Sequence, residues 1–159
     1  MEQKQTLEEQ IVSLLKEKGM QVSFAESCTG GLLSGKLVNV AGVSDVFKES
    51  YVTYANEAKH SLLGVSNETL QEYGAVSRQV AEQMARGAAK RSGAQTAVSV
   101  TGIAGPDGGT AFKPVGLVYI GCLVNGTVTV TENHFEGSRA EVRNQTVDAA
   151  LMLLLDCLS

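Results

Sequence analysis

The sequence has no long apolar run, no excess of basic residues and no readable secretory signal, and each absence excludes a class of protein. Its longest wholly apolar run, Ala149 to Leu155, is far shorter than the roughly 20 residues of a membrane-spanning helix. The net charge is -4, which argues against a broad basic surface for nucleic acid. The start, MEQKQTLEEQ, is polar, with no basic segment leading into an apolar one. We therefore expect a cytoplasmic protein that binds neither nucleic acid nor a membrane.

Cysteine and histidine are too few and too scattered to build a disulfide framework or a zinc site. The three cysteines, Cys28, Cys122 and Cys157, form no C-x-x-C pair, which suits reduced thiols. The only histidines, His60 and His134, do not lie near a cysteine pair. No metal site is therefore legible, and we expect no cofactor.

What is present describes an ordinary globular protein. Hydrophobic residues make up 43% of the chain and charged residues 19%. A chain of 159 residues is long enough to bury a core without disulfides or metal. Because no repeat, linker or low-complexity segment interrupts the sequence, we expect residues 1–159 to form a single domain.

Helix-like and strand-like segments alternate along the chain. Apolar spacing and capping signals predict helices at 7–18, 29–38, 56–64, 77–91 and 138–157, with a turn or short helix at 66–72. Strands are predicted at 20–25, within 46–54, and at 96–102, 115–124 and 127–135. Asn125-Gly126 is a strong two-residue hairpin signal between the last two. This order predicts an α/β fold, a three-layer α/β/α sandwich on a mixed, mostly parallel sheet that contains a C-terminal hairpin.

The segment FAESCTGG, residues 24–31, joins the first predicted strand to the second predicted helix. A junction with two glycines frees main-chain N–H groups at the positive end of a helix dipole, where they can stabilise a phosphate or an oxyanion. Ser27 then stands beside these donors as a candidate nucleophile. In the other interpretation, to which the segment alone gives equal weight, Ser27 or Thr29 only caps the helix and the glycines permit the turn. Cys28 also competes as nucleophile, but a free cysteine beside a strand is more often a small buried residue.

The same region contains an incomplete P-loop pattern. Gly30, Gly35 and Lys36 satisfy its glycine and lysine positions, but the next residue is Leu37, where a serine or threonine should hold magnesium. We therefore interpret Lys36 as a solvated helix residue.

The segment YVTYANEAKH, residues 51–60, places a lysine near the start of a predicted helix. If Asn56 is the N-cap, Lys59 occupies the third helical position, where the helix dipole disfavours a positive charge. Burial would lower the pKa of Lys59 further, and the neutral amine could then act as a base. Tyr54, at the end of the preceding strand, could relay or orient a proton. Taken alone, the segment favours a surface lysine near Glu57 instead.

A third candidate region combines the loop TGIAGPDGG, residues 101–109, with the last helix. Its glycines allow close approach of a ligand to the main chain, and it follows a strand, where open α/β sheets usually bind ligands. Arg139 and Arg143, four residues apart on the last helix, share one face and can fork onto a phosphate. Each element alone could be a tight turn or a solvated face. Together, in an acidic protein, they suggest a small anionic substrate.

An ordered set of motifs resembles one known family. AESCTGG, VTYANEAK, GAVS, TGIAGPDGGT followed by KPVG, and G-x-R-x-x-V-R on the closing helix are similar to the C-terminal domain of the competence/damage-inducible protein CinA. That domain also occurs alone as a bacterial nicotinamide-nucleotide amidase. The resemblance runs from about Leu7 to the end of the chain. It implies hydrolysis of the carboxamide of nicotinamide mononucleotide in pyridine nucleotide salvage, an α/β/α fold, no metal, and a homo-oligomer, commonly a dimer.

The resemblance also implies roles for individual residues. It makes Ser27 the nucleophile, with Lys59 and Tyr54 as its partners, and it places an arginine of the closing motif, Arg139 or Arg143, in the substrate site. The remaining predicted oxyanion or substrate-binding residues are Thr29, Gly30, Gly31, Asn56, Thr101, Gly102 and Gly105.

The chemistry of the residues agrees with this resemblance at one point. Hydrolysis of an amide needs an activated hydroxyl, a base and donors for the oxyanion, and neither histidine has an evident carboxylate partner. We therefore predict that neutral Lys59 takes the proton of Ser27, which forms an acyl-enzyme while N–H groups of residues 29–31 hold the oxyanion. The alternative is a non-catalytic nucleotide-binding regulatory module, which would have no use for Ser27, Tyr54 and Lys59 together.

Overall fold

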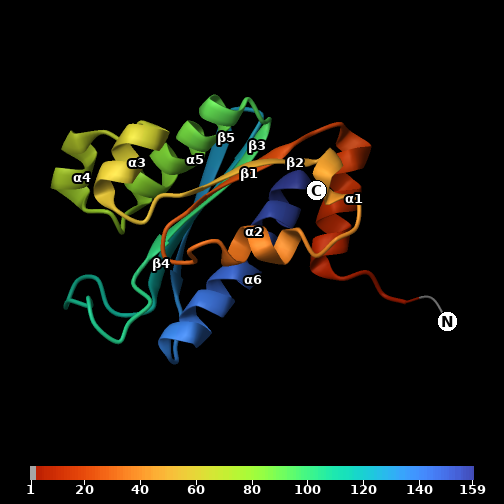
Figure 1. The fold of residues 1–159 in the computed structure, drawn as a ribbon. Helices are drawn as coiled ribbons and strands as arrows, with labels where there is room; N and C mark the ends of the chain where they lie inside the picture. Colours follow the sequence, from red (N-terminus) through yellow and green to blue (C-terminus); the bar gives the residue numbers. More distant parts are fainter. Residues whose placement is uncertain (1–2) are drawn as a thin grey trace.

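A five-stranded mixed sheet forms the centre of the molecule, with helices on both faces (Figure 1). The structure, a computed structural model, describes residues 3–159. Its strands, in chain order, are β1 (Val22–Glu26), β2 (Phe47–Val52), β3 (Thr96–Gly102), β4 (Leu117–Val124) and β5 (Thr127–His134). The order across the sheet is β2-β1-β3-β4-β5. β1 pairs in parallel with β2 and β3, whereas β3–β4 and β4–β5 are antiparallel, so of the five strands described only β4 runs against the others. The predicted mixed, mostly parallel sheet is confirmed.

The turn between β4 and β5 is the predicted two-residue hairpin. Asn125 has a φ of 48° and Gly126 a φ of 86°. Positive φ at both central positions is the mark of a type I′ turn, whose twist matches that of the flanking strands. The C-terminal hairpin is therefore confirmed.

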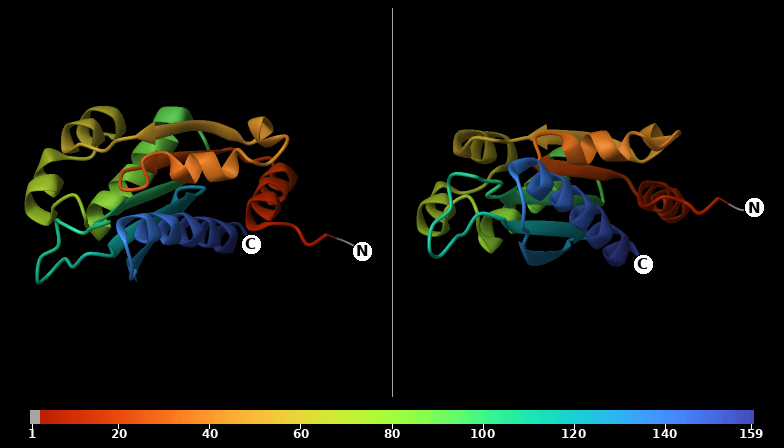
Figure 2. Two further views of the ribbon diagram at one scale, coloured as in Figure 1. Left: turned by 60° about the horizontal axis from the view of Figure 1, so that its bottom comes forward. Right: turned by 90° about the horizontal axis from the view of Figure 1, so that it is seen from below.

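The helices form the two outer layers, as Figure 2 shows from two further directions. The α-helices are α1 (Leu7–Lys18), α2 (Leu32–Leu37), α3 (Asn56–Leu63), α4 (Asn67–Tyr73), α5 (Arg78–Ser92) and α6 (Arg139–Leu158), and a 3₁₀ turn, η1, spans Val43–Asp45. α1, α2 and α6 pack on one face of the sheet, and α5 covers the other face with α3 and α4 against it. None of the helices within residues 3–159 is both long and apolar enough to cross a membrane.

The core lies on both faces of the sheet, in two apolar clusters. The larger cluster joins Phe24, Val98 and Ile120 of the strands to buried leucines of α1, α2 and α6. The smaller one packs α5 and α3 against small strand residues such as Ala25 and Ala97. Because successive strand residues face opposite sides, both faces of β1 and β3 are buried and their side chains are fixed in place.

Two predicted helix starts are wrong by a few residues. The N-cap of α3 is Ala55, so Asn56 is the first helical residue and Lys59 the fourth rather than the third. Helix α2 begins at Leu32 rather than near Thr29, because Gly30 and Gly31 have φ values of 57° and 107°, which a right-handed helix cannot adopt. Residues 27–31 therefore form an irregular loop between β1 and α2.

The parallel arrangement of β1, β2 and β3 brings three segments to one edge of the sheet. The loop 27–31 follows β1, the segment 53–55 leads from β2 into α3, and the loop 103–116 follows β3. Each segment contains, or leads directly into, one of the three regions singled out in the sequence. The edge at which parallel strands end is where open α/β sheets bind their ligands.

Candidate active site

A cavity of about 270 Å³ lies at this edge of the sheet. Its size is close to the lower end of the range for small-molecule sites, about 300–1,000 Å³, so it suits a small ligand rather than a polymer. It brings together eight of the predicted site residues: Ser27, Tyr54, Asn56, Lys59, Thr101, Gly102, Gly105 and Arg139.

Lys59 points from α3 toward the start of the loop after β1. Its Nζ lies 3.0 Å from Ser27 Oγ, 2.8 Å from the carbonyl oxygen of Thr53 and 3.1 Å from that of Tyr54. Lys59 is only 1% exposed and Ser27 8% exposed. The structure therefore brings the predicted nucleophile and base into hydrogen-bonding contact, and the alternative of a surface lysine is wrong.

The three neighbours of Lys59 Nζ can satisfy either protonation state of the amine, as three acceptors for an ammonium or as two acceptors and one hydroxyl donor for a neutral amine. A neutral amine has two N–H donors and one lone pair, and the two carbonyl oxygens can accept only. With both N–H groups donated to Thr53 and Tyr54, the lone pair faces the hydroxyl of Ser27. Burial lowers the pKa of Lys59, against a smaller opposing effect of the neighbouring Cys28 thiol. Within residues 3–159 no carboxylate lies within 4.0 Å of this amine to favour its charged form. The surroundings thus favour the form that can take a proton from Ser27.

Cys28 is a buried side chain with the opposite chemical character. Burial raises the pKa of its thiol to about 11, although its own main-chain N–H and Arg143 lower it. A thiol with so high a pKa carries almost no thiolate near neutral pH, and the thiolate is the reactive form. The lower rank given to Cys28 as nucleophile agrees with this environment.

Glu26, the last residue of β1, belongs to the site region but is not among the residues predicted from the sequence. Its side chain is fully buried. The carboxylate accepts hydrogen bonds from the N–H groups of Gly31 at 3.2 Å, Leu33 at 2.9 Å and Ser34 at 3.0 Å. It also accepts from the hydroxyls of Thr29 at 2.6 Å and Ser34 at 2.5 Å. The signal was present, because an acidic residue beside a helix start is the natural partner of free N–H groups there.

The position of Glu26 corrects the predicted oxyanion donors. The N–H of Gly31 donates to Glu26, and the N–H of Gly30 donates to the carbonyl of Ser27 at 3.1 Å, so neither is free for a ligand. Of the three predicted donors only the N–H of Thr29 remains. Within the described part of the chain, no acceptor from another residue engages the N–H of Thr29 or of Cys28.

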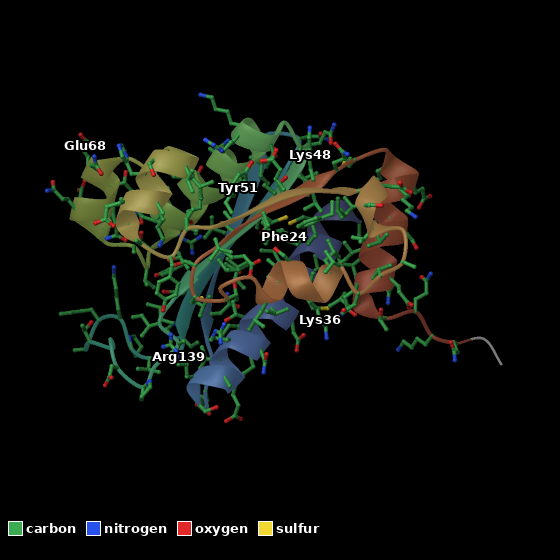
Figure 3. The ribbon with its side chains drawn as sticks, in the orientation of Figure 1. Phe24, Lys36, Lys48, Tyr51, Glu68 and Arg139 are labelled. Carbon is green, nitrogen blue, oxygen red and sulfur yellow. The ribbon has the colours of Figure 1, made fainter. Side chains whose placement is uncertain are left out.

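The two arginines of α6 have different surroundings, although both lie near its N-terminal end. Arg139 lines the cavity and donates to the carbonyl of Gly105 at 2.8 Å and to the hydroxyl of Tyr54 at 3.1 Å. Figure 3 shows Arg139 at the N-terminal end of α6, beside the loop after β3. Arg143 lies outside the cavity lining and donates to the carbonyls of Cys28 at 3.0 Å and Thr29 at 3.1 Å. The expectation that both fork onto one phosphate therefore does not fit the structure.

Tyr54 touches the site through two different groups. Its main-chain carbonyl accepts from Lys59, whereas its hydroxyl accepts from Arg139. The side chain is 61% exposed, at the mouth of the cavity. A role for the hydroxyl in relaying a proton stays a prediction, because its hydrogen bond leads to Arg139.

Gly102, the last residue of β3, and Gly105 in the following loop let the main chain approach its neighbours closely. A Cβ atom on Gly102 would lie 2.5 Å from the side chain of Val118, and one on Gly105 would lie 2.5 Å from that of Val115. Thr101 is held by its hydroxyl, which donates to the carbonyl of Ala75 at 2.9 Å. These residues shape one wall of the cavity.

The residues interpreted as bystanders lie away from the cavity. Lys36 is exposed on α2 (Figure 3), as expected for a solvated residue. His60 binds the carbonyl of Val65 through Nδ1 at 2.8 Å, and His134 lies on β5 near Glu132. Neither histidine lines the cavity.

Comparisons with known proteins give a consistent result. The sequence matches the family model described as the CinA C-terminal domain over residues 4–158. A CinA-like protein from Kosmotoga olearia is 52% identical over 147 residues, covering 92% of this chain and 36% of that protein. The competence/damage inducible protein CihA from Agrobacterium tumefaciens, a solved structure, is 47% identical with a TM-score of 0.92, and 100% of each chain is covered. The competence damage-inducible protein A (ComA) from Klebsiella pneumoniae is 33% identical with a TM-score of 0.93, covering 96% of this chain and 94% of that chain. The chain spans only 36% of the length of the curated relatives it matches.

Proposed function

The chain belongs to the CinA C-terminal domain family, and we propose that it is an amidase that hydrolyses nicotinamide mononucleotide to nicotinate mononucleotide and ammonia. The observation that carries this proposal is the contact of 3.0 Å between Lys59 Nζ and Ser27 Oγ in a buried site. A hydroxyl beside an uncharged amine is the pair of groups that attack on an amide carbon requires.

The first half of the reaction forms an acyl-enzyme. Lys59 takes the proton of Ser27 as the serine oxygen bonds to the carboxamide carbon, and the carbonyl electrons move onto the oxygen of a tetrahedral intermediate. When that intermediate collapses, the C–N bond breaks and the ammonium group of Lys59 returns its proton to the leaving nitrogen, which departs as ammonia. The nicotinoyl group is then an ester of Ser27, and Lys59 is again neutral.

The second half of the reaction releases the acid. Lys59 takes a proton from water as the water oxygen attacks the ester carbon, and the proton returns to Ser27 when the ester bond breaks. The neutral amine is needed at the start of both halves, and the environment of Lys59 favours that form. No step requires a metal or a cofactor.

Arg139 supports the choice of an anionic substrate. It is the arginine that lines the cavity, and it uses only two of its five N–H groups on Gly105 and Tyr54. The others can donate to a phosphate, in a protein whose overall net charge is -4. We include a cytoplasmic location and a homo-oligomer, with a dimer favoured, in the same proposal.

The test is release of ammonia from nicotinamide mononucleotide by the purified chain. We expect ammonia and nicotinate mononucleotide to form in equal amounts. Isothermal titration calorimetry with nicotinamide mononucleotide is the control for binding. Tight binding of the nucleotide without ammonia release would favour the regulatory binding module instead.

A further inference from the structure

The loop that carries the nucleophile is held between two charged side chains that do not line the cavity. Arg143 binds it from α6, and Glu26 binds it from the end of β1. Both side chains contact the main chain of the loop rather than Ser27 itself. Their geometry decides which N–H groups of the loop are left free.

Arg143 fixes two consecutive peptide groups. Its Nε donates to the carbonyl of Cys28 at 3.0 Å and its Nη2 donates to that of Thr29 at 3.1 Å. The peptide bonds of this loop are trans, so each N–H points away from the carbonyl of the same peptide group. With the carbonyl of Cys28 turned toward Arg143, the N–H of Thr29 is directed away from it. The N–H of Gly30, on the next peptide group, reaches the carbonyl of Ser27 at 3.1 Å.

The remaining peptide group of the loop is fixed by that same bond. Because the carbonyl of Ser27 accepts from Gly30, the N–H of Cys28 points the other way. Glu26 engages the next N–H, that of Gly31, and so anchors the far end of the loop. The outcome is two successive N–H groups, those of Cys28 and Thr29, directly after the nucleophile and with no acceptor from another residue in the described chain.

We propose that Arg143 is a positioning residue, which holds the carbonyls of Cys28 and Thr29 so that the N–H groups of these two residues form the oxyanion hole for Ser27. An N–H group of the residue that follows a nucleophilic serine is well placed for this task, because it lies within one residue of the reacting oxygen. The inference rests on the serine–lysine chemistry of the proposed function, but not on the identity of the substrate. It gives Arg143 no contact with a substrate phosphate.

Labelling of Ser27 by a fluorophosphonate probe tests the inference without the nucleotide. In this reaction the serine oxygen bonds to phosphorus, the P–F bond breaks, fluoride leaves, and the serine proton goes to Lys59. The phosphoryl oxygen gains negative charge in the transition state, so the rate reports the oxyanion hole. Removing one oxyanion donor slows an enzyme about 10²–10³-fold, and we expect Arg143→Gln to slow labelling about 10²-fold.

The control variant is Arg86→Gln, since Arg86 lies on the far helix α5, where it pairs with Glu82 at 3.1 Å. It should label like the unaltered chain. Arg143→Gln should lower the plateau of the pH–rate profile and leave its midpoint, set by Lys59, in place. A labelling rate within 3-fold of the unaltered chain, or a shifted midpoint with the same plateau, would overturn the inference. If Arg143→Gln does not fold, Arg143→Lys replaces it, because one ammonium cannot fork onto both carbonyls.

A second arm separates the positioning role from a phosphate-binding role. Ammonia release is compared for nicotinamide mononucleotide and for the nucleoside without its phosphate. A positioning role predicts that Arg143→Gln lowers kcat by a similar factor for both, whereas a loss in KM confined to the phosphorylated substrate would overturn it. If the unaltered chain labels rapidly but releases no ammonia from either compound, the proposed substrate is wrong, and the labelling data still decide the role of Arg143. A chain that is not labelled at all overturns the inference, because it has no activated serine to position.

Discussion

Two buried ionisable side chains, Glu26 and Lys59, lie in the same active-site region with opposite surroundings. Glu26 receives hydrogen bonds from three N–H groups and three hydroxyls, at distances of 2.5 to 3.5 Å. Lys59 faces two carbonyls and one hydroxyl, and no carboxylate approaches it within residues 3–159. The carboxylate has a full set of donors, whereas the amine has no carboxylate partner in the described chain to offset the cost of burying its charge. The first arrangement stabilises the loop, and the second favours the uncharged amine that the proposed reaction needs.

The largest expected effect is the loss of turnover when Lys59 or its partner Ser27 is replaced. Lys59→Met and Ser27→Ala should each lower kcat at least about 10³-fold, since removing a nucleophile or its base abolishes the attack rather than weakening it. Steady-state ammonia release measures the effect. Lys36→Met and Ser61→Ala are the matched controls. Lys36 on α2 and Ser61 on α3 are both exposed, and both lie outside the cavity lining. Near-normal turnover in either site variant would end the serine–lysine mechanism.

Removal of the carboxylate should affect stability first. Glu26→Leu leaves three N–H groups without their acceptor, that of Leu33 buried and those of Gly31 and Ser34 part-buried, and one unsatisfied buried donor costs about 1–3 kcal/mol. We therefore expect a loss of about 3 kcal/mol or more in the free energy of unfolding, measured with urea.

The free energy of unfolding of Glu26→Gln should lie between those of Glu26→Leu and the unaltered chain. The amide oxygen of the glutamine can still accept, but its NH₂ group faces the N–H of Ser34. Lys59→Met removes a titratable amine whose charge burial disfavours, but leaves the carbonyls of Thr53 and Tyr54 without its N–H groups, so it should lower the free energy of unfolding by less than Glu26→Leu does. Equal losses for Glu26→Leu and Lys59→Met would contradict the contrast between the two side chains.

The pH dependence tests the surroundings of Lys59 directly. Burial lowers the pKa of its amine, so the folded chain releases this proton at a lower pH than the unfolded chain does. Between the two pKa values the unfolded state binds more protons, and stability therefore rises with pH across that window. Below the folded pKa the full cost of charging a buried amine is present.

The measurement compares the unaltered chain with Lys59→Met in urea at a series of pH values. The free energy of unfolding of the unaltered chain, taken relative to that of Lys59→Met, should increase as the pH rises from the folded pKa toward 10.5, the ordinary value. The rate of ammonia release should rise on the acid side with the same midpoint. A rate that still rises at pH 10 would show that the pKa of the Lys59 amine is not lowered.

The fold could be predicted almost entirely from local sequence signals, because each of them is a short-range effect. Asn125-Gly126 specifies its own turn, and apolar spacing marks α1 and α6. The start of α2 at Leu32 could not be placed, because it depends on hydrogen bonds made by a residue outside the helix. The start of α2 is fixed by Glu26, whose carboxylate takes the N–H groups of Leu33 and Ser34.

The residue types of the site could be predicted from the sequence, but the separate roles of its two arginines could not. The resemblance to the CinA C-terminal domain paired Ser27 with Lys59, the needs of amide hydrolysis agreed with that pairing, and so does their contact of 3.0 Å. Arg139 and Arg143 are indistinguishable in sequence, four residues apart on one helix. Only the packing of α6 against the loop after β1 shows that one guanidinium lines the cavity while the other holds main-chain carbonyls.

The smallest predicted effect concerns Cys28, which lies between Glu26 and Lys59 in the sequence and lines the cavity. Its pKa of about 11, raised by burial, keeps the thiol protonated at neutral pH. Cys28→Ala should therefore leave kcat within about 3-fold of the unaltered value, because its main-chain N–H is unchanged and the substitution removes only one buried sulfur atom, at a cost in stability of about 1 kcal/mol. Iodoacetamide should modify Cys28 slowly at pH 7, as followed by mass spectrometry, with Cys157 as the more exposed comparison. A large loss of kcat in Cys28→Ala with normal stability would move the nucleophile from the serine to the thiol, and with it the reason for keeping the amine of Lys59 uncharged.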